Sequence, residues 1–288
     1  MRNHKHMPVT LQDYKSPMFP TWCPGCGDFG IWQAIKQALV NQGKQPHEVC
    51  IVYGIGCSGN MSSFVRAYGF HSLHGRALAS AFGIKLANPN LTVVVVAGDG
   101  DTYSEGIQHF LAAIRQNIDI KFIVHDNHTF SLTTGQASPT SDQGRETKIT
   151  PQGSPDRPLY PLPLAISQEA SFVARGFAGD IPHLTGLVEK MLQHKGFAYT
   201  DVLQHCPSYD HDRTAQWYWK NIAKLEGDGF TKEEAMRLAG EHNKANLGVF
   251  YKNPQKEFTE IVPRLAASPL ALQKLAPRDI SDTLKGLF

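Results

Sequence analysis

The chain has 288 residues, a formal net charge of +2 and 41% apolar residues, and these values exclude several classes of protein. The length is sufficient to bury a full α/β core. The near-neutral charge, without blocks of Lys or Arg, gives no reason to expect nucleic-acid binding. No apolar run reaches the length of about 18 residues that a membrane span needs. With no visible signal peptide, we expect a cytoplasmic protein without membrane contact.

The first predicted elements follow a proline-containing lead-in, residues 1–27. Residues 28–41 have helical periodicity, and Gly43 stands just past their end as a stop signal. A short apolar strand is predicted over 49–53 and a second helix over about 76–87. Alternation of strands with helices predicts a parallel sheet covered by helices.

A strand–helix–strand unit is predicted next, with strands over 91–97 and 120–126 and a helix over 104–115. Both strands are β-branched, apolar runs, which is typical of strands buried on both faces of a parallel sheet. The first strand runs into Gly98-Asp99-Gly100 and the second into Asn127, with 26 residues between Gly100 and Asn127. Because ligands bind beyond the carboxyl ends of parallel strands, we expect Asp99 and Asn127 to lie side by side.

These residue types suit a magnesium–diphosphate site. Magnesium takes hard oxygen ligands, partly from protein and partly from phosphate and water, and the oxygens of Asp99 and Asn127 fit that need. Gly98 and Gly100 allow a tight turn that brings backbone N–H groups close to phosphate oxygens. The alternative, a glycine turn beside an unrelated asparagine, is weakened by the position of both segments at strand ends.

The rest of the chain contains a long loop and two further predicted strands. Residues 136–163 hold six prolines and no periodicity, and we expect this loop to cover the bound ligand. Strands are predicted over 172–175 and 198–204, with a helix near 183–194. The fold class is therefore α/β, with a doubly wound, mostly parallel sheet. We divide the chain into the lead-in 1–27, the α/β domain 28–209 and a C-terminal extension 210–288, which we expect to pack on another subunit.

The cysteines pose a separate question. Cys23 and Cys26 form a C-x2-C hairpin, but no second C-x2-C follows to complete a zinc ribbon. A thioredoxin-like motif should follow a strand, whereas residues 16–20 are a proline-broken loop. Disulfides are disfavoured in the reducing cytoplasm. Cys50 lies inside an apolar strand and is interpreted as a core residue. A four-cysteine zinc site and an iron–sulfur cluster both stay open from the residues alone.

The spacing of Gly98-Asp99-Gly100 and Asn127 resembles the thiamine diphosphate motif. The stretch 126–136, with the blocks 22–27, 53–59 and 70–76, resembles the β subunits of the 2-oxoacid:ferredoxin oxidoreductases from about residue 21 to 209. The resemblance implies Mg2+ ligation by Asp99, Asn127 and the backbone carbonyl of Thr129. It also implies a [4Fe-4S] cluster held by Cys23, Cys26, Cys57 and Cys206. The cofactor-binding residues that we expect in addition are Ile55, Gly56, Cys57, Ser58, His74, Gly98, Gly100, Asp101, Leu132 and Thr133.

By the same resemblance, the chain takes part in oxidative decarboxylation of a 2-oxoacid with coenzyme A, and electrons pass to a ferredoxin; a low-potential cluster would also allow the reverse reaction. The α subunit is expected to supply the glutamate that activates thiamine, in an αβ or (αβ)2 assembly. His74 is a candidate catalytic hydrogen-bond donor. The blocks 54–59 and 69–78 favour 2-oxoglutarate over pyruvate. Two alternatives remain, and in each of them the cysteines bind structural zinc. One is a non-oxidative thiamine diphosphate enzyme and the other is a binding subunit.

Overall fold

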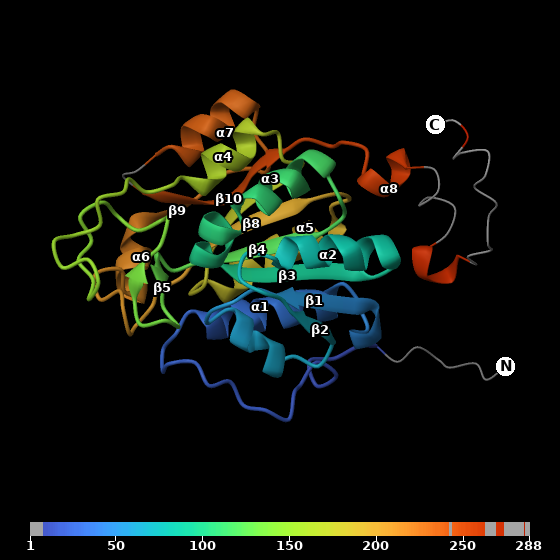
Figure 1. The fold of residues 1–288 in the computed structure, drawn as a ribbon, viewed down its shortest axis with the longest axis horizontal. Helices are drawn as coiled ribbons and strands as arrows, with labels where there is room; N and C mark the ends of the chain where they lie inside the picture. Colours follow the sequence, from blue (N-terminus) through green and yellow to red (C-terminus); the bar gives the residue numbers. More distant parts are fainter. Residues whose placement is uncertain (1–7, 242–243, 263–268, 274–284, 286–288) are drawn as a thin grey trace.

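The computed structural model describes residues 8–241, 244–262, 269–273 and 285. Its centre is an eight-stranded sheet with the strand order β2-β1-β3-β4-β8-β7-β10-β9 (Figure 1). Every neighbouring pair in this sheet is parallel except β7 and β10, which are antiparallel. This arrangement confirms the predicted α/β class with a mostly parallel sheet.

The elements of the first half of the chain are close to those predicted. The helix over 28–41 and the strand over 49–53 are found with the predicted bounds, and the elements of the strand–helix–strand unit differ from prediction by at most three residues at their ends. The edge strand β2 was not predicted. The helices and strands of this half are α1 (Asp28–Asn41), β1 (Val49–Tyr53), β2 (Tyr68–His71), α2 (Ala77–Ala87), β3 (Thr92–Gly98), α3 (Ile107–Gln116), β4 (Lys121–Asp126), β5 (Thr129–Phe130) and β6 (Gln136–Ala137).

The second half of the chain adds β7, β8, β9 and β10 to the sheet, and β10 runs antiparallel to β7. Short β5 and β6 form a separate hairpin. The remaining helices and strands are α4 (Pro161–Ser167), β7 (Phe172–Phe177), α5 (Ile181–Gln193), β8 (Ala198–Leu203), α6 (Ala215–Asn221), β9 (Ile222–Lys224), α7 (Lys232–Ala239), β10 (Ala245–Lys252) and α8 (Phe258–Ile261).

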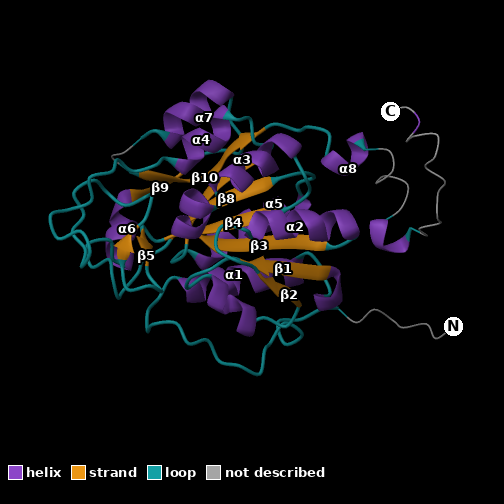
Figure 2. Cartoon of the chain, viewed as in Figure 1, coloured by secondary structure: helices purple, strands orange, loops and turns teal. Residues whose placement is uncertain are grey.

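Helices cover both faces of the sheet (Figure 2). Alternate residues of the central strands point to opposite faces, so Val94 and Val96 join one apolar cluster with α1 and α5, whereas Val93 and Val95 join a second cluster with α2, α3 and α4. The two clusters hold the central strands on both sides, which fixes the positions of the strand ends. Within the described part of the chain, none of the helices is both long and apolar enough to span a membrane.

The segment after Tyr209 contributes more to this sheet than its sequence suggested. β10 pairs with β7 and is buried along nearly its whole length, and β9 pairs with β10. Leu247, Val249 and Phe250 of β10 are therefore part of the same core. Packing of the later residues on another subunit stays a prediction, and much of that stretch (263–268, 274–284 and 286–288) lies outside the described residues.

Candidate functional site

A cavity lies at the carboxyl ends of β3 and β4. Its walls come from the β1–β2 connection, the ends of the two strands and the segment after β4. All thirteen residues that we assigned to cofactor binding line it: Ile55, Gly56, Cys57, Ser58, His74, Gly98, Asp99, Gly100, Asp101, Asn127, Thr129, Leu132 and Thr133. Sequence reasoning missed three further lining residues, His125, Phe130 and Ser131.

Asp99 is buried at the floor of this cavity, 1% exposed. Its Oδ2 accepts hydrogen bonds from the hydroxyls of Ser138 and Thr140, the latter at 2.7 Å. Thr140 Oγ1 also lies 2.7 Å from Asp126 Oδ1, so one hydroxyl proton stands between two carboxylates and serves one at a time. Among the described residues, no Lys, Arg or His makes an ion pair with Asp99.

This environment fits a cation. Burial, reinforced by the charge of Asp126, raises the pKa of Asp99 to about 8. A carboxylate buried without a positive partner is unfavourable, and a divalent metal ion bound at its free oxygen would supply that partner. Asp99 therefore has the donor chemistry and the unbalanced charge that a magnesium ligand needs.

Asn127 and Thr129 form a local turn after β4. The backbone N–H of Thr129 donates to Asn127 Oδ1 at 3.2 Å, and Asn127 Nδ2 donates to Ser131 Oγ at 3.2 Å. These two bonds orient the amide, and Oδ1 keeps a second lone pair for a metal ion. The structure thus places Asp99, Asn127 and Thr129 around the same cavity, and their binding of Mg2+ stays a prediction.

Position 100 needs a glycine because the ring of Phe130 lies against it. A Cβ atom at this position would lie 2.4 Å from the Phe130 ring, closer than any real contact. The chain then enters a π-helical turn, Asp101–Glu105, before α3 begins. Such turns occur often at functional sites because they alter the direction of side chains in a helix.

His74 lies at the rim of the cavity. Its Nδ1 is 2.8 Å from Asp101 Oδ1 and 3.2 Å from Glu105 Oε2, and its side chain is 37% exposed. Asp101 is buried and also accepts hydrogen bonds from the backbone N–H groups of Gly75 and Ile55. Asp101 therefore joins three loops of the cavity wall and fixes His74. The roles predicted for these two side chains, cofactor binding and catalysis, stay predictions.

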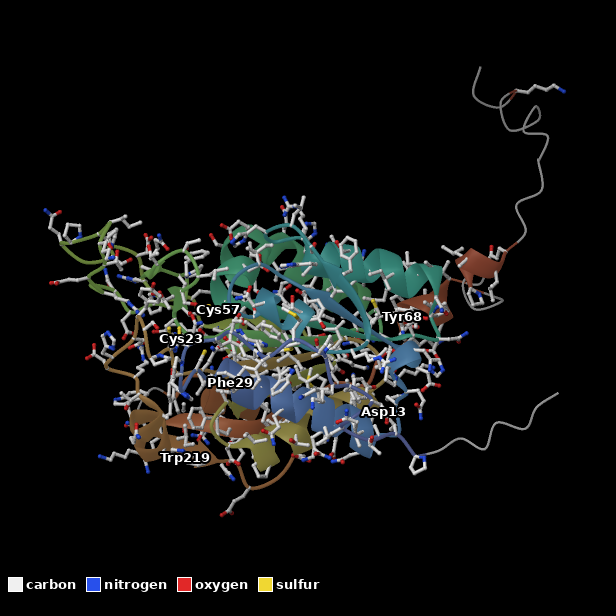
Figure 3. All side chains as sticks on the ribbon, turned by 90° about the horizontal axis from the view of Figure 1, so that it is seen from below. Asp13, Cys23, Phe29, Cys57, Tyr68 and Trp219 are labelled. Atoms are coloured by element: carbon white, nitrogen blue, oxygen red, sulfur yellow. The ribbon has the colours of Figure 1, made fainter. Side chains whose placement is uncertain are left out.

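Four of the five cysteines gather beside the cavity. The Cys57 thiol lies close enough to the thiols of Cys23, Cys26 and Cys206 for their charges to interact, and the same holds for Cys23 and Cys206. Figure 3 shows Cys23 and Cys57 close to each other. Trp22 Nε1 donates to the Cys57 carbonyl at 2.7 Å, which ties the C-x2-C hairpin to the β1–β2 connection.

The fifth cysteine and the thiol chemistry agree with the predicted grouping. Cys50 is buried within β1, and its neighbours belong to the apolar cluster on the α2 face. Burial raises the pKa of the Cys57 thiol to about 11 and that of Cys206 above its usual value. Such thiols remain protonated without a metal, whereas bound metal displaces the proton. All five cysteines are free of disulfides.

The spacing of the four thiols bears on which metal they suit. Among the described residues, no three His, Cys, Asp or Glu side chains are close enough to hold a single metal ion. Zinc draws four ligands to one centre at about 2.0–2.3 Å. An iron–sulfur cluster binds each thiolate at a different iron and so separates them further. The choice between an iron–sulfur cluster and zinc at these thiols therefore stays a prediction.

We expected the loop over 136–163 to cover the cavity, but in the structure it does not. None of its residues lines the cavity. Instead, the hydroxyls of Ser138 and Thr140 donate hydrogen bonds to the buried carboxylate of Asp99, and that of Thr140 also to Asp126. The physical reason is that buried carboxylates need hydrogen-bond donors, and this loop supplies them. Ser138 and Thr140 of this loop therefore support Asp99 and Asp126.

The fold and the site define a thiamine diphosphate-binding α/β domain. In agreement, the family model described as thiamine pyrophosphate enzyme, C-terminal TPP binding domain, matches residues 54–202. A second family model, for the C terminal of the pyruvate ferredoxin oxidoreductase beta subunit, matches residues 206–267.

Similar proteins of known identity show to which family of thiamine diphosphate-binding proteins this chain belongs. A 2-oxoacid:ferredoxin oxidoreductase β subunit of Aeropyrum pernix is 38% identical over 93% of this chain and 91% of its own length. A 2-oxoglutarate synthase subunit KorB of Archaeoglobus fulgidus is 36% identical over 90% and 95%. A solved 2-oxoglutarate:ferredoxin oxidoreductase from Magnetococcus marinus, with 2-oxoglutarate, coenzyme A and succinyl-CoA bound, superposes with a TM-score of 0.88 at 34% identity, over 98% and 97% of the two chains. The chain belongs to the family of 2-oxoacid:ferredoxin oxidoreductase β subunits. It is therefore one subunit of an enzyme complex that contains an α partner.

Proposed function

We propose that this β subunit holds thiamine diphosphate through Mg2+, carries a [4Fe-4S] cluster, and acts with its α subunit in the coenzyme A-dependent oxidative decarboxylation of 2-oxoglutarate to succinyl-CoA. Electrons leave through the cluster to a ferredoxin. The similarity to KorB subunits and to the Magnetococcus marinus enzyme supports the choice of 2-oxoglutarate. Pyruvate or another 2-oxoacid is the alternative substrate.

The observation that carries this proposal is the double position of Cys57. It lines the cofactor cavity and also belongs to the group of four thiols. Ser131 connects the two sites, because its hydroxyl donates to Cys57 Sγ at 3.2 Å and accepts from Asn127 Nδ2 at 3.2 Å. A metal cluster at the thiols would therefore be in close contact with the residues that hold the cofactor, which suits electron transfer between them.

Each residue group has a distinct task in this proposal. Asp99, Asn127 and the Thr129 carbonyl hold Mg2+, and the backbone around Gly98 and Gly100 receives the diphosphate. The bound thiamine supplies the electron sink for decarboxylation. Ile55, Gly56 and Ser58 shape the wall between cofactor and thiols. No glutamate lines the cavity in the described part of the chain, so the α subunit has to supply the activating carboxylate.

The test is a panel of 2-oxoacids on the anaerobically purified αβ complex, with coenzyme A and a viologen dye as electron acceptor. We expect 2-oxoglutarate to give the highest kcat/KM and the reaction to require coenzyme A. A preference for pyruvate would reassign the substrate, and turnover without an acceptor would indicate a non-oxidative thiamine enzyme. Iron and zinc analysis of the same sample separates the cluster from structural zinc.

A further inference from the structure

Serine hydroxyls donate hydrogen bonds to two of the four grouped cysteines. Ser131 Oγ donates to Cys57 Sγ at 3.2 Å, and Ser208 Oγ donates to Cys23 Sγ at 3.1 Å. A cysteine that binds a metal does so as a thiolate, and a charged acceptor takes such bonds more strongly than a neutral thiol. Both serines are therefore placed to act on the sulfur atoms that we propose as cluster ligands.

The two serines differ in their other hydrogen bonds. Ser131 is buried in the turn after Phe130, and its Oγ accepts a hydrogen bond from Asn127 Nδ2 at 3.2 Å. In the described part of the chain, Ser208 Oγ makes no hydrogen bond other than the one to Cys23. Ser131 thus stands in the middle of a chain of hydrogen bonds, whereas Ser208 is a donor with nothing behind it.

All bonds of the chain through Ser131 run in one direction. The backbone N–H of Thr129 donates to Asn127 Oδ1 at 3.2 Å, so the amide oxygen lies on the Thr129 side and the amide nitrogen on the Ser131 side. The Ser131 hydroxyl has a single proton, which it donates to Cys57 Sγ. Asn127 Oδ1 is also the proposed magnesium ligand. A cation at this oxygen draws electron density from the amide, so Nδ2 and then the Ser131 hydroxyl become stronger donors.

We propose that Ser131 couples occupancy of the magnesium–thiamine diphosphate site to the reduction potential of the cluster at Cys57. Reduction adds one negative charge at the thiols, so every hydrogen bond to their sulfur atoms favours the reduced form and raises the potential. Mg2+ at Asn127 strengthens the bond from Ser131, and electron uptake becomes more favourable when the cofactor is bound. The electron comes from the 2-oxoacid and leaves to ferredoxin, as in the proposed function, on which this inference rests.

Ser131→Ala and its matched control Ser208→Ala separate this coupling from a simple effect of one hydrogen bond. Each variant loses one hydroxyl donor to one sulfur atom, but only Ser131→Ala also interrupts the connection to Asn127. The midpoint potential is measured in the anaerobically purified αβ complex by redox titration followed by electron paramagnetic resonance. Each titration is done after removal of the cofactor and again with thiamine diphosphate and Mg2+ added.

Without cofactor, both variants should show a ratio of reduced to oxidised cluster about tenfold lower at a fixed potential, or about 59 mV for one electron. Cofactor and Mg2+ change this ratio through their electric field, which acts in every form of the complex, and in addition through Ser131. The cofactor-dependent change should be parental in Ser208→Ala. In Ser131→Ala it should be lower by about twofold, or about 18 mV, because cooperative strengthening of one bond is modest. Ser131→Thr, which keeps the hydroxyl, should restore the parental change.

A parental cofactor-dependent change in Ser131→Ala would overturn the coupling, and so would an equal loss of this change in Ser208→Ala. Should Ser131→Ala lose its iron, the parent complex gives the answer. The exchangeable protons near the reduced cluster are detected by electron–nuclear double resonance in H2O and D2O, and the coupling of one of them has to increase when thiamine diphosphate and Mg2+ are added. Unchanged couplings refute the proposal. Zinc in place of iron in the parent complex, or no binding of thiamine diphosphate, would instead refute the proposed function itself.

Discussion

Gly98 and Gly100 differ in what an added methyl group would meet, and this difference separates cofactor binding from folding. At Gly98 the nearest atoms to a Cβ are Ser58 Oγ at 3.9 Å and the Ile55 carbonyl at 4.0 Å. At Gly100 they are three carbons of the Phe130 ring at 2.4 to 2.7 Å. We expect Gly98→Ala to change the free energy of unfolding of the cofactor-free chain by less than about 0.5 kcal/mol. Gly100→Ala should lower it by about 1–3 kcal/mol through overpacking.

Gly98→Ala should have a large effect on cofactor affinity, although its effect on the free energy of unfolding is small. Its methyl group would stand in the cavity, where we propose that backbone N–H groups meet the diphosphate. Hydrogen bonds to charged groups contribute about 1.5–3 kcal/mol each, so the loss of one weakens binding about tenfold to a hundredfold. Gly98→Ala should therefore be a folded protein that binds thiamine diphosphate poorly.

The assay combines denaturant unfolding without cofactor and calorimetric titration with thiamine diphosphate at saturating Mg2+. Gly83→Ala is the control, because Gly83 is an exposed helical position where a Cβ meets nothing within 4 Å. That variant should keep parental binding and gain about 1 kcal/mol of stability from helix propensity. Parental affinity in Gly98→Ala, or a loss of stability as large as in Gly100→Ala, would show that the cavity is not the diphosphate site.

Three further predictions concern the metal sites and pH. Asp99→Ala should abolish Mg2+-dependent cofactor binding and leave the cluster spectrum unchanged; parental affinity would contradict its role as a ligand. Iron content should fall on serine substitution at each of four cysteines but not in Cys50→Ser, and iron loss confined to Cys50→Ser would contradict the set Cys23, Cys26, Cys57 and Cys206. Burial, with Lys121 nearby, lowers the pKa of His194 to about 4. The folded state thus disfavours the charged ring, so stability is complete above pH 6.5 and falls by up to about 2 kcal/mol toward pH 4. His194→Gln should reduce that loss in urea unfolding at the two pH values.

The sequence was informative where a local pattern decides the structure. The helix over Asp28–Asn41 follows from its apolar spacing and its glycine stop, and the strand ends at Gly98 and Asp126 follow from β-branched runs. Because parallel strands end at one edge, the amino-acid order alone was enough to place Asp99 and Asn127 together.

Other features depend on contacts between distant residues. β2 has only four residues, all of them exposed, and β10 is interrupted by Gly248 at a positive φ. The bonds from Ser138 and Thr140 to Asp99 span 39 and 41 residues, and the contact of His125 with Asp28 spans 97. One signal for the last pair was present: His125 directly follows the apolar run 122–124 of a buried strand, and a buried histidine has to have a polar partner.

The division of the site between subunits gives the last prediction. Thiamine becomes a nucleophile only when a carboxylate bonds its pyrimidine ring, and the glutamate nearest to the motif, Glu105, instead pairs with His74 at the rim and is 43% exposed. The cavity walls formed by the described residues include Asp99 and Asp101, but both carboxylates are engaged at the floor and between loops. The isolated chain should therefore bind cofactor weakly, through its diphosphate alone, and show no turnover. Addition of the α subunit should raise cofactor affinity and restore reduction of ferredoxin that depends on 2-oxoacid and coenzyme A. Turnover by the lone chain, freed of any contaminating α partner, would require an activating carboxylate within this sequence and contradict the divided site.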